Sequence, residues 1–337
     1  MSKTKLIDVA NKAGVSKSTA SQFLNGRFDY MSAKTKARIQ EAIDELQYVP
    51  NSIARSLKTD KTKTLGVIVR DITGDYTSQA IRGMDDYCKQ NGYNLIIYNT
   101  DFDPASERKA IASLRNLRVD GLIIASSGAN NALVAELSSK IMPVVQFQLE
   151  HDKLDKDIIV SDYRQAAFDA TQYLISLGHR RIAFVTQRYK EVHSRLERYL
   201  GYTEALAEHG ISIDDSLVQY WDRENGLEVS AEHMLSIENP PTAFFTQHLA
   251  ITVALMRSMQ VHKVSMPEDV SLISFDEIPM AEFFKVPITV VQQNPYEIGM
   301  QAAKSMINKI INPDAQLAKV MVPCCLVKRD SCSILKS

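Results

Sequence analysis

The sequence predicts a small all-α helix-turn-helix head followed by an α/β body of two doubly wound lobes. The first 48 residues show the apolar spacing of helices and no strand pattern. From residue 64, short apolar runs alternate with amphipathic stretches, which is typical of βα units in parallel sheets. The length of 337 residues allows about two domains with ample core, and roughly 270 residues of βα alternation suit two lobes.

The head is expected to contain three short helices. Its first helix has apolar residues at helical spacing, namely Leu6, Val9, Ala10 and Ala13. Gly14 should end that helix, and Ser16 stands where an N-cap opens the next, which runs through Ala20, Phe23 and Leu24. Ser32 should cap a third helix before Pro50, with one apolar face of Ile39, Ala42, Ile43 and Leu46. Two helices joined by a tight turn containing Gly form the helix-turn-helix pattern.

The body is expected to be built on buried parallel strands. Its apolar runs are Leu65 to Val69, Asn94 to Tyr98, Gly121 to Ala125, Val144 to Phe147, Ile158 to Val160, Ile182 to Val185, Ala243 to Phe245 and Val270 to Phe275. Mostly helical stretches separate them, so helices should cover both faces of the sheets. Ligands of such sheets bind beyond the carboxyl ends of the strands, and the residues that directly follow these runs are therefore candidate site residues.

The charge distribution separates the head from the body. The whole chain has a net charge of -1, which indicates no partner. Residues 1–64, however, hold twelve basic and six acidic side chains, a net charge of +6, and the remaining residues carry -7. This asymmetry favours an anion-binding head, with nucleic acid as the leading candidate. Charge alone leaves open the alternative of a solvated basic face.

Several classes of protein are disfavoured by what the sequence lacks. Cys88, Cys324, Cys325 and Cys332 have no metal-ligand spacing, and we expect reduced thiols in a cytosolic chain. No signal-peptide pattern or long uncharged apolar run is present, so the protein should be neither secreted nor membrane-spanning.

No phosphate-binding glycine loop and no set of catalytic residues can be assembled from local spacing, so we expect neither an enzyme nor a cofactor. His179 can be imagined as a general base, but it follows a predicted helix end. A His there more often satisfies carbonyls of the last turn.

A set of motifs throughout the chain resembles the lactose/galactose repressor family of bacterial transcription regulators. In the head these are Leu6-Ile7-Asp8-Val9-Ala10, Ala13-Gly14-Val15-Ser16, Ser32-Ala33-Lys34-Thr35, Tyr48-Val49-Pro50-Asn51 and Ala54-Arg55-Ser56-Leu57-Lys58. In the body they are Leu177-Gly178-His179-Arg180-Arg181-Ile182, Arg198 with Gly201-Tyr202, Phe275-Asp276, Pro287-Ile288-Thr289 and Leu326-Val327-Lys328-Arg329. The resemblance implies a DNA-binding domain (1–49), a hinge helix or linker (50–63) and a two-lobed, periplasmic-binding-protein-like effector-binding and dimerisation domain (64–337).

The resemblance also implies which head residues contact DNA. The second helix of such a motif lies in the major groove. Lys17, Ser18 and Gln22 are expected on base edges, whereas phosphate contacts and helix orientation fall to Ser16, Thr19, Ser21 and Asn25. Lys17 can donate to guanine, and Gln22 suits adenine. Many family members have Arg at the position of Gln22, so the operator half-site should differ there.

The stretch from Asn51 to Lys58 resembles the family's hinge helix, which folds on the operator and enters the minor groove as a pair from a dimer. Leu57 matches the residue that wedges a base step, with Ala54 and Lys58 beside it. The alternative is a polar linker with one unrelated Leu.

For the effector, the resemblance implies Arg198 as the strongest contact, because it matches the family's Arg-x-x-Gly-aromatic pattern. Asp276 matches an acceptor of sugar hydroxyls, and Trp221 falls where a ring stacks on the ligand, although a lone Trp is often simply core. Tyr76 and Ser194 are weaker candidates.

The chain also departs from sugar-responsive members of the family. It has Gln148 where they often have Asp, and Thr246-Gln247 where they have Asn-Asp, while Arg70 and Arg198 supply positive charge. Loss of negative charge beside retained cations favours an anionic ligand. We expect a sugar acid such as gluconate, a hexuronate or 2-keto-3-deoxygluconate, and a phosphosugar as the next choice.

These observations together predict a dimeric, cytoplasmic repressor of a carbohydrate or sugar-acid operon, released from a pseudo-palindromic operator by its effector. The eight residues that follow Arg329 are too few for a tetramer-forming heptad helix, so a homodimer is expected. Corepression by the ligand stays open. A transport solute-binding protein is disfavoured by the basic head, and a sugar-modifying enzyme by the missing catalytic sets.

Overall fold

The computed structural model describes residues 4–29, 31–49, 61–148, 157–189, 192–315 and 319–335. The chain forms two compact units, Met1–Thr62 and Lys63–Ser337. No helix among the described residues has the length and apolar character needed to cross a membrane.

The head contains α1 (Leu6–Ala13), α2 (Lys17–Leu24) and α3 (Ala33–Glu45). Gly14 ends α1 with a left-handed φ of 61°, a conformation that costs glycine nothing. Ser16 and Ser32 cap the next two helices, as the sequence predicts, each accepting a hydrogen bond from the backbone N–H three residues later. A small core holds the helices together, formed by Val9, Ala13, Ile39 and Ala42.

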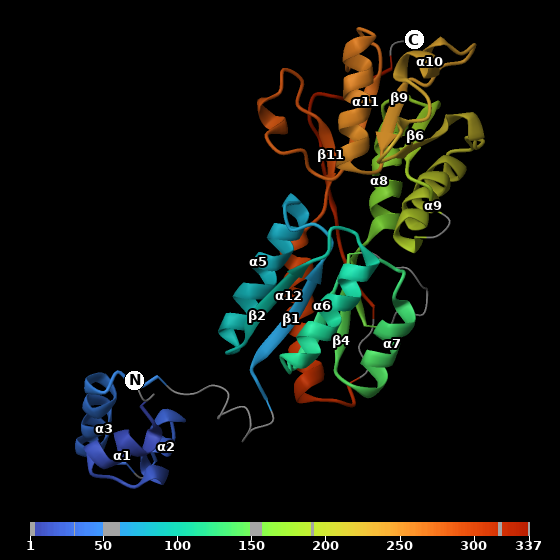
Figure 1. Cartoon of the computed structure of the whole chain (residues 1–337). Helices are drawn as coiled ribbons and strands as arrows, with labels where there is room; N and C mark the ends of the chain where they lie inside the picture. Colours follow the sequence, from blue (N-terminus) through green and yellow to red (C-terminus); the bar gives the residue numbers. More distant parts are fainter. Residues whose placement is uncertain are drawn as a thin grey trace. The chain divides into compact units, whose positions relative to one another are not determined.

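The first lobe of the body is a six-stranded sheet in the order β12-β5-β4-β3-β1-β2, and all its pairings are parallel. Its strands are β1 (Thr64–Val69), β2 (Asn94–Asn99), β3 (Gly121–Ile124), β4 (Val144–Phe147), β5 (Ile158–Ser161) and β12 (Val320–Val322). Its helices are α5 (Asp75–Gln90), α6 (Pro104–Asn116), α7 (Asn131–Lys140) and α12 (Pro295–Ile311). One face of the sheet packs on α5 and α12 and the other on α6 and α7 (Figure 1), so the strands are buried on both sides.

The second lobe is a seven-stranded sheet in the order β13-β11-β10-β9-β6-β7-β8, with antiparallel pairs only at its two edges in the described ladder. Its strands are β6 (Ile182–Thr186), β7 (Val218–Asp222), β8 (Gly226–Leu227), β9 (Ala243–Thr246), β10 (Ser271–Phe275), β11 (Thr289–Gln292) and β13 (Cys325–Val327). Its helices are α8 (Tyr163–Ser176), α9 (His193–Glu208), α10 (Ala231–Ser236) and α11 (Leu249–Val261), with short 3-10 turns η1 (Asp215–Leu217) and η2 (Ala281–Phe283). The prediction of two doubly wound lobes is confirmed.

The chain crosses between the lobes at three places in its described part: from β5 to α8, from β11 to α12 and from β12 to β13. At two of these crossings, Ser161 Oγ donates to Gln293 Oε1 at 2.6 Å. Each lobe is therefore assembled from separated segments, and the crossings lie next to each other.

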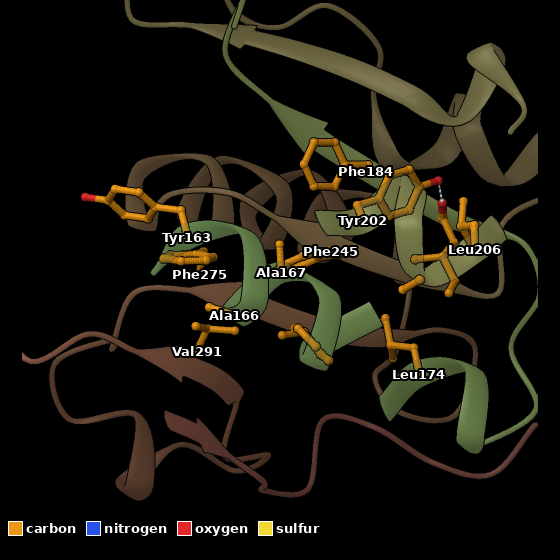
Figure 2. Close-up of a cluster of buried hydrophobic side chains, with 14 of the residues drawn as sticks. Tyr163, Ala166, Ala167, Leu174, Phe184, Tyr202, Leu206, Phe245, Phe275 and Val291 are labelled. Atoms are coloured by element: carbon orange, nitrogen blue, oxygen red, sulfur yellow. Dashed lines mark hydrogen bonds between the residues drawn. The ribbon is translucent and has the colours of Figure 1, made fainter. Parts of the chain in front are cut away.

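A layer of aromatic and aliphatic side chains forms the core beneath α8 and α9 (Figure 2). Tyr202 of α9 stacks on Phe184 of β6 with ring centroids 4.7 Å apart, and its hydroxyl donates to the carbonyl of Ile182 at 2.9 Å. At the edge of this core, Tyr163 and Phe275 lie close together, with centroids 6.0 Å apart. These two rings connect the core to the ligand site described below.

Candidate functional site

The exposed surface of α2 carries the residues expected to read DNA bases. Lys17, Ser18 and Gln22 are all exposed, and Ser18 and Gln22 are four residues apart and therefore neighbours on one face. The buried Ala20 fixes the opposite face of α2 on the head's core. These three polar side chains are therefore available to a groove.

Of the remaining predicted DNA-binding residues of the head, Ser16 and Asn25 cap the two ends of α2, and Thr19 and Ser21 lie within the helix and bond to these caps. Ser16 Oγ accepts from the backbone N–H of Thr19 at 3.0 Å and bonds the Thr19 hydroxyl at 2.8 Å. At the other end, Asn25 Nδ2 donates to the carbonyl of Ser21 at 2.8 Å. Ser16 and Asn25 are exposed, whereas Thr19 and Ser21 are half-buried. Their side chains thus secure the helix ends in the free head, and their phosphate contacts stay a prediction.

Arg38 of α3 supports the turn of the head, and the sequence reasoning did not identify it. Its Nη2 donates to the carbonyls of Ala13 and, at 3.1 Å, Gly14, so α3 holds the turn between α1 and α2 in place. A Cβ added at Gly14 would collide with the Arg38 guanidinium. The Gly14 carbonyl lies 24 residues before Arg38 in the sequence, so no local pattern could predict this hydrogen bond.

The predicted hinge residues Ala54, Leu57 and Lys58 lie outside the described residues. Their proposed role in the minor groove stays a prediction.

The body contains a cavity of about 1110 Å³ that is lined by residues of both lobes. Six of the nine predicted effector residues line it: Arg70, Tyr76, Gln148, Arg198, Trp221 and Asp276. They converge because the carboxyl ends of the parallel strands of both lobes meet there: Arg70 follows β1, Gln148 follows β4 and Asp276 follows β10. The volume is slightly above the range of about 300–1,000 Å³ that is typical of small-molecule sites.

Arg198 is held rigidly at the junction of the lobes. It lies on α9, is only 7% exposed, and its guanidinium carbon is 4.3 Å from the centroids of both Tyr163 and Phe275. Figure 2 shows these two rings at the edge of the core. Two cation–π contacts and a hydrogen bond from Nη1 to the carbonyl of Gln247 at 3.3 Å fix the group without neutralising its charge.

Gly201 explains why the family pattern requires glycine three residues after the arginine. A Cβ at Gly201 would lie 2.1 Å from the carbonyl oxygen of Arg164 on α8. Only glycine allows α9 to approach α8 this closely, and that approach places Arg198 over the Tyr163 ring at the start of α8.

Asp276 and Gln148 stand at strand ends in the left-handed backbone region, with φ of 80° and 75°. Such conformations are costly for non-glycine residues and cluster at functional sites. Asp276 accepts a hydrogen bond from Gln293 Nε2, while the carbonyl of Gln148 accepts from the Tyr163 hydroxyl at 2.7 Å. Gln293 thereby joins the cavity's carboxylate to Ser161 at the lobe crossing.

The other three predicted effector residues do not line the cavity. Thr246 is fully buried, and its hydroxyl bonds that of Thr252 at 2.6 Å inside the lobe. Ser194 is also fully buried, in the first turn of α9. Gln247 is 2% exposed and lies just behind the cavity, where Oε1 accepts from Thr186 at 2.6 Å.

Four buried polar atoms have no hydrogen-bond partner within the described part of the chain: Arg70 Nε, Arg198 Nε, Gln247 Nε2 and the Tyr76 hydroxyl. All belong to residues predicted from the sequence to contact the effector. Three of the four are obligate donors, and two of these, Arg70 Nε and Arg198 Nε, belong to residues that line the cavity. Burial lowers the pKa of Arg70 and raises the pKa of Tyr76 well above its ordinary value, as expected for polar groups removed from water.

Several lining residues were not predicted. Arg195, Arg223, Arg257 and His248 add basic groups, and Arg195 could have been found from its spacing, because it lies three residues before Arg198 on the same helix face. Burial lowers the pKa of His248; the charge of Asp276 opposes this shift, while Arg198, Arg195 and Arg70 add to it. Phe102 of the first lobe contacts Arg223 of the second, 4.5 Å from ring centroid to guanidinium carbon, and no sequence signal indicates this pair.

A smaller cavity of about 490 Å³ contains Arg164, Glu197 and Glu204, but these charges pair with one another. No group of three potential metal ligands occurs in the described ranges. His179 has a structural role, yet its partners differ from those expected: its ring bonds the Thr242 hydroxyl at 2.9 Å and the Ser333 carbonyl at 3.1 Å, not the last turn of α8. The ring spans two segments far apart in the sequence, which local spacing cannot reveal.

A helix-turn-helix head joined to a two-lobed body with a polar interlobe cavity defines a ligand-responsive DNA-binding regulator. Two family descriptions match the chain: "Bacterial regulatory proteins, lacI family" over residues 5–51, and "Periplasmic binding proteins and sugar binding domain of LacI family" over residues 62–330. The chain belongs to the LacI family of bacterial transcription regulators.

Similar proteins of known name agree with this assignment. The "Probable HTH-type transcriptional regulator EndR" of Paenibacillus polymyxa is 34% identical, covering 91% of each chain. The ribose operon repressor of Escherichia coli K12 is 32% identical over 96% of this chain and 98% of its own. A crystal structure of the lac repressor dimer with operator and an anti-inducer shares the fold, with a TM-score of 0.79 and 22% identity over 97% of this chain and 98% of that chain. These relatives are regulators of transcription rather than enzymes.

Proposed function

We propose that this chain is a cytoplasmic, homodimeric repressor of carbohydrate or sugar-acid utilisation genes, and that its effector is a sugar acid. The observation that carries the ligand class is the set of unpartnered donors around the cavity, above all the two arginines Arg70 and Arg198. A carboxylate supplies paired acceptor oxygens that match guanidinium donors, whereas the remaining hydroxyls of a sugar acid suit Asp276 and Gln148.

A neutral pentose is the alternative effector, because the ribose operon repressor is among the relatives. The charges in the cavity favour the anion. Arg70 and Arg198 have no ion-pair partner among the described residues, and a neutral sugar would leave both charges uncompensated.

Binding between the lobes gives the effector a route to the DNA. A ligand that contacts residues of both lobes stabilises one arrangement of the lobes over another, and it can shift DNA affinity only by its differential affinity for the two arrangements. Under this proposal Lys17, Ser18 and Gln22 read the half-sites of a pseudo-palindromic operator, and paired hinge segments with Ala54, Leu57 and Lys58 bind between them.

The ligand class is tested by titrating the protein and following the fluorescence of Trp221, the one Trp of the sequence, which lines the cavity. Gluconate, galacturonate, 2-keto-3-deoxygluconate and glucose 6-phosphate are compared with ribose and glucose. We expect saturable changes with at least one acid and none with the neutral sugars. A response to ribose or glucose alone would refute the assignment.

A further inference from the structure

Several arginines of the second lobe that lie outside the cavity have their charge balanced by a carboxylate. Carboxylate oxygens lie within 4.0 Å of four of them, in the pairs Arg164–Glu204, Arg181–Asp214, Arg188–Glu228 and Arg329–Glu277, whereas the exposed Arg180 has no such pair in the described part of the chain. Arg70, Arg195 and Arg198 have no such pair in the described ranges of the chain. Arg198 is buried, and Arg70 and Arg195 are half-buried; charges that lose contact with water normally require a partner more than exposed charges do.

Arg195 stands out because nothing in the family pattern implies it. It lies one turn before Arg198 on α9, lines the same cavity, and donates from Nη1 to the carbonyl of Arg188 at 3.2 Å. This hydrogen bond orients the guanidinium but leaves its charge uncompensated. A planar guanidinium has five N–H donors, so several of them are available to a ligand.

The electrostatics show that the three guanidinium groups act on one another. Burial and, to a smaller extent, the positive charges of Arg198 and Arg70 together lower the pKa of Arg195 to about 10. All three arginines also lower the pKa of His248, which lines the cavity beside them. Like charges are therefore concentrated in one region of the cavity at neutral pH.

The carboxylates that line the cavity do not remove this excess. Asp75 and Glu224 are exposed, Asp71 is half-buried and accepts from the Thr73 hydroxyl, and Glu277 is engaged by Arg329. The charge of Asp276 reaches His248, and that of the buried Glu107, which does not line the cavity, reaches Arg70. Three guanidiniums thus face two nearby carboxylates, and neither carboxylate forms an ion pair with them in the described part of the chain.

We propose that Arg195 is a specificity-determining residue that, with Arg70 and Arg198, forms a three-arginine site for a single oxyanion group of the effector, either a carboxylate or a phosphate. The assignment rests on the proposed function for the sugar part of the ligand, but the oxyanion site itself is defined by the three arginines. Arg195 distinguishes acids from neutral sugars, because a ligand without an oxyanion leaves the repulsion among the guanidiniums uncompensated.

A binding role and a purely structural role of Arg195 predict different effects of its substitution. Replacing Arg195 by Met removes one of three like charges while keeping an apolar stem of similar length, so the ligand-free protein should unfold at the same or a higher temperature. The same substitution should weaken binding of an oxyanion by about 10- to 100-fold, since charge-assisted hydrogen bonds are lost. Arg195→Lys should keep part of the affinity, because charge remains without the planar fork.

The test uses inorganic phosphate as the probe of the site, at constant ionic strength set with chloride, and follows thermal unfolding of wild type, Arg195→Met and Arg195→Lys. Arg108→Met is the matched control, because Arg108 is an exposed arginine of α6 that does not line the cavity. Phosphate should raise the midpoint of wild type and the control, and this stabilisation should be lost in Arg195→Met. Equal stabilisation of all variants, or none of wild type, would overturn the three-arginine site.

Parallel titrations with gluconate, glucose 6-phosphate and glucose separate this inference from the proposed function. If wild type binds an acid and Arg195→Met binds it equally well, the role of Arg195 is wrong and the proposed ligand class stands. If the substitution weakens glucose and the acids alike, Arg195 only supports the fold of the site, and the inference fails. If wild type binds glucose and neither acid, the proposed function fails together with the inference.

Discussion

Adding a single methyl group at Gly201 should lower both the free energy of unfolding and the affinity for the effector. The substitution Gly201→Ala adds a Cβ that would lie 2.1 Å from the carbonyl oxygen of Arg164 and 3.0 Å from the backbone nitrogen of Phe168. Both atoms belong to the backbone of α8, so neither can turn aside. The helices α8 and α9 must separate by roughly 1 Å to restore ordinary contact.

This collision should lower the free energy of unfolding. Overpacking of a core typically costs about 1–3 kcal/mol, against which the higher helix propensity of Ala returns up to about 1 kcal/mol. We expect a net loss of roughly 1–2 kcal/mol in the free energy of unfolding. Arg198 moves with α9 away from the rings of Tyr163 and Phe275, so effector affinity should fall by about tenfold or more.

The assay combines thermal unfolding with titration of an effector. Gly83→Ala is the matched control, because its Cβ would lie 2.1 Å from the carbonyl of Tyr296 in the α5–α12 contact of the first lobe. Both variants should lose similar stability, and only Gly201→Ala should lose effector affinity. Equal affinities of Gly201→Ala and wild type would refute the explanation of the Arg-x-x-Gly pattern.

Three further predictions concern the head and the core. Gln22→Ala should remove discrimination at one operator base pair, worth about 1–3 kcal/mol, as measured by DNA binding to all variants of that pair; unchanged discrimination would contradict the assignment of Gln22. Arg38→Met should weaken operator binding while leaving the slope of log affinity against log salt unchanged, because Arg38 holds turn carbonyls; a slope reduced by about 0.9 would instead show a lost phosphate contact. Burial lowers the pKa of His179 from 6.5 in the folded state, so the unfolded chain takes up a proton that the native state resists and stability falls as pH drops below 6.5. In denaturant titrations from pH 7 to pH 5, the free energy of unfolding of His179→Gln should fall less steeply than that of wild type, and the two slopes should differ by up to about 1.4 kcal/mol per pH unit. Parallel curves for the two proteins would contradict a role of His179 in this loss of stability.

Much of the fold could be predicted because its signals are local. Caps such as Ser16 and Ser32 and the apolar runs of β1, β4 and β10 depend on neighbours in sequence, and the structure confirms them. The strands β7, β8, β11, β12 and β13 were not predicted, and β8 is only two residues long. β7 and β11 mix polar and apolar residues, while β12 and β13 are three residues long, and such strands are defined by their partners in the sheet rather than by their own pattern.

The residues of the interlobe cavity likewise divide into those that local sequence patterns predict and those that depend on tertiary packing. Residues that directly follow buried strands, such as Arg70 and Asp276, are predictable because parallel strands end at one edge of a sheet. Thr246 ends β9, yet its hydroxyl is used inside the lobe by Thr252, which is one helical turn into the next element. Phe102 and Arg223 come from different lobes, and their contact depends on tertiary packing that no local pattern encodes.

The most direct test of the proposed function is the response of DNA binding to the effector. Fluorescence anisotropy would measure the affinity of the full chain for labelled DNA from the region flanking its own gene, with and without the acid that binds best and with ribose as the neutral control. Release by a sugar acid predicts an apparent affinity about 5- to 150-fold lower in the presence of the acid and unchanged with ribose. An affinity that the acid leaves unchanged or increases, or that only ribose lowers, would contradict the proposed function.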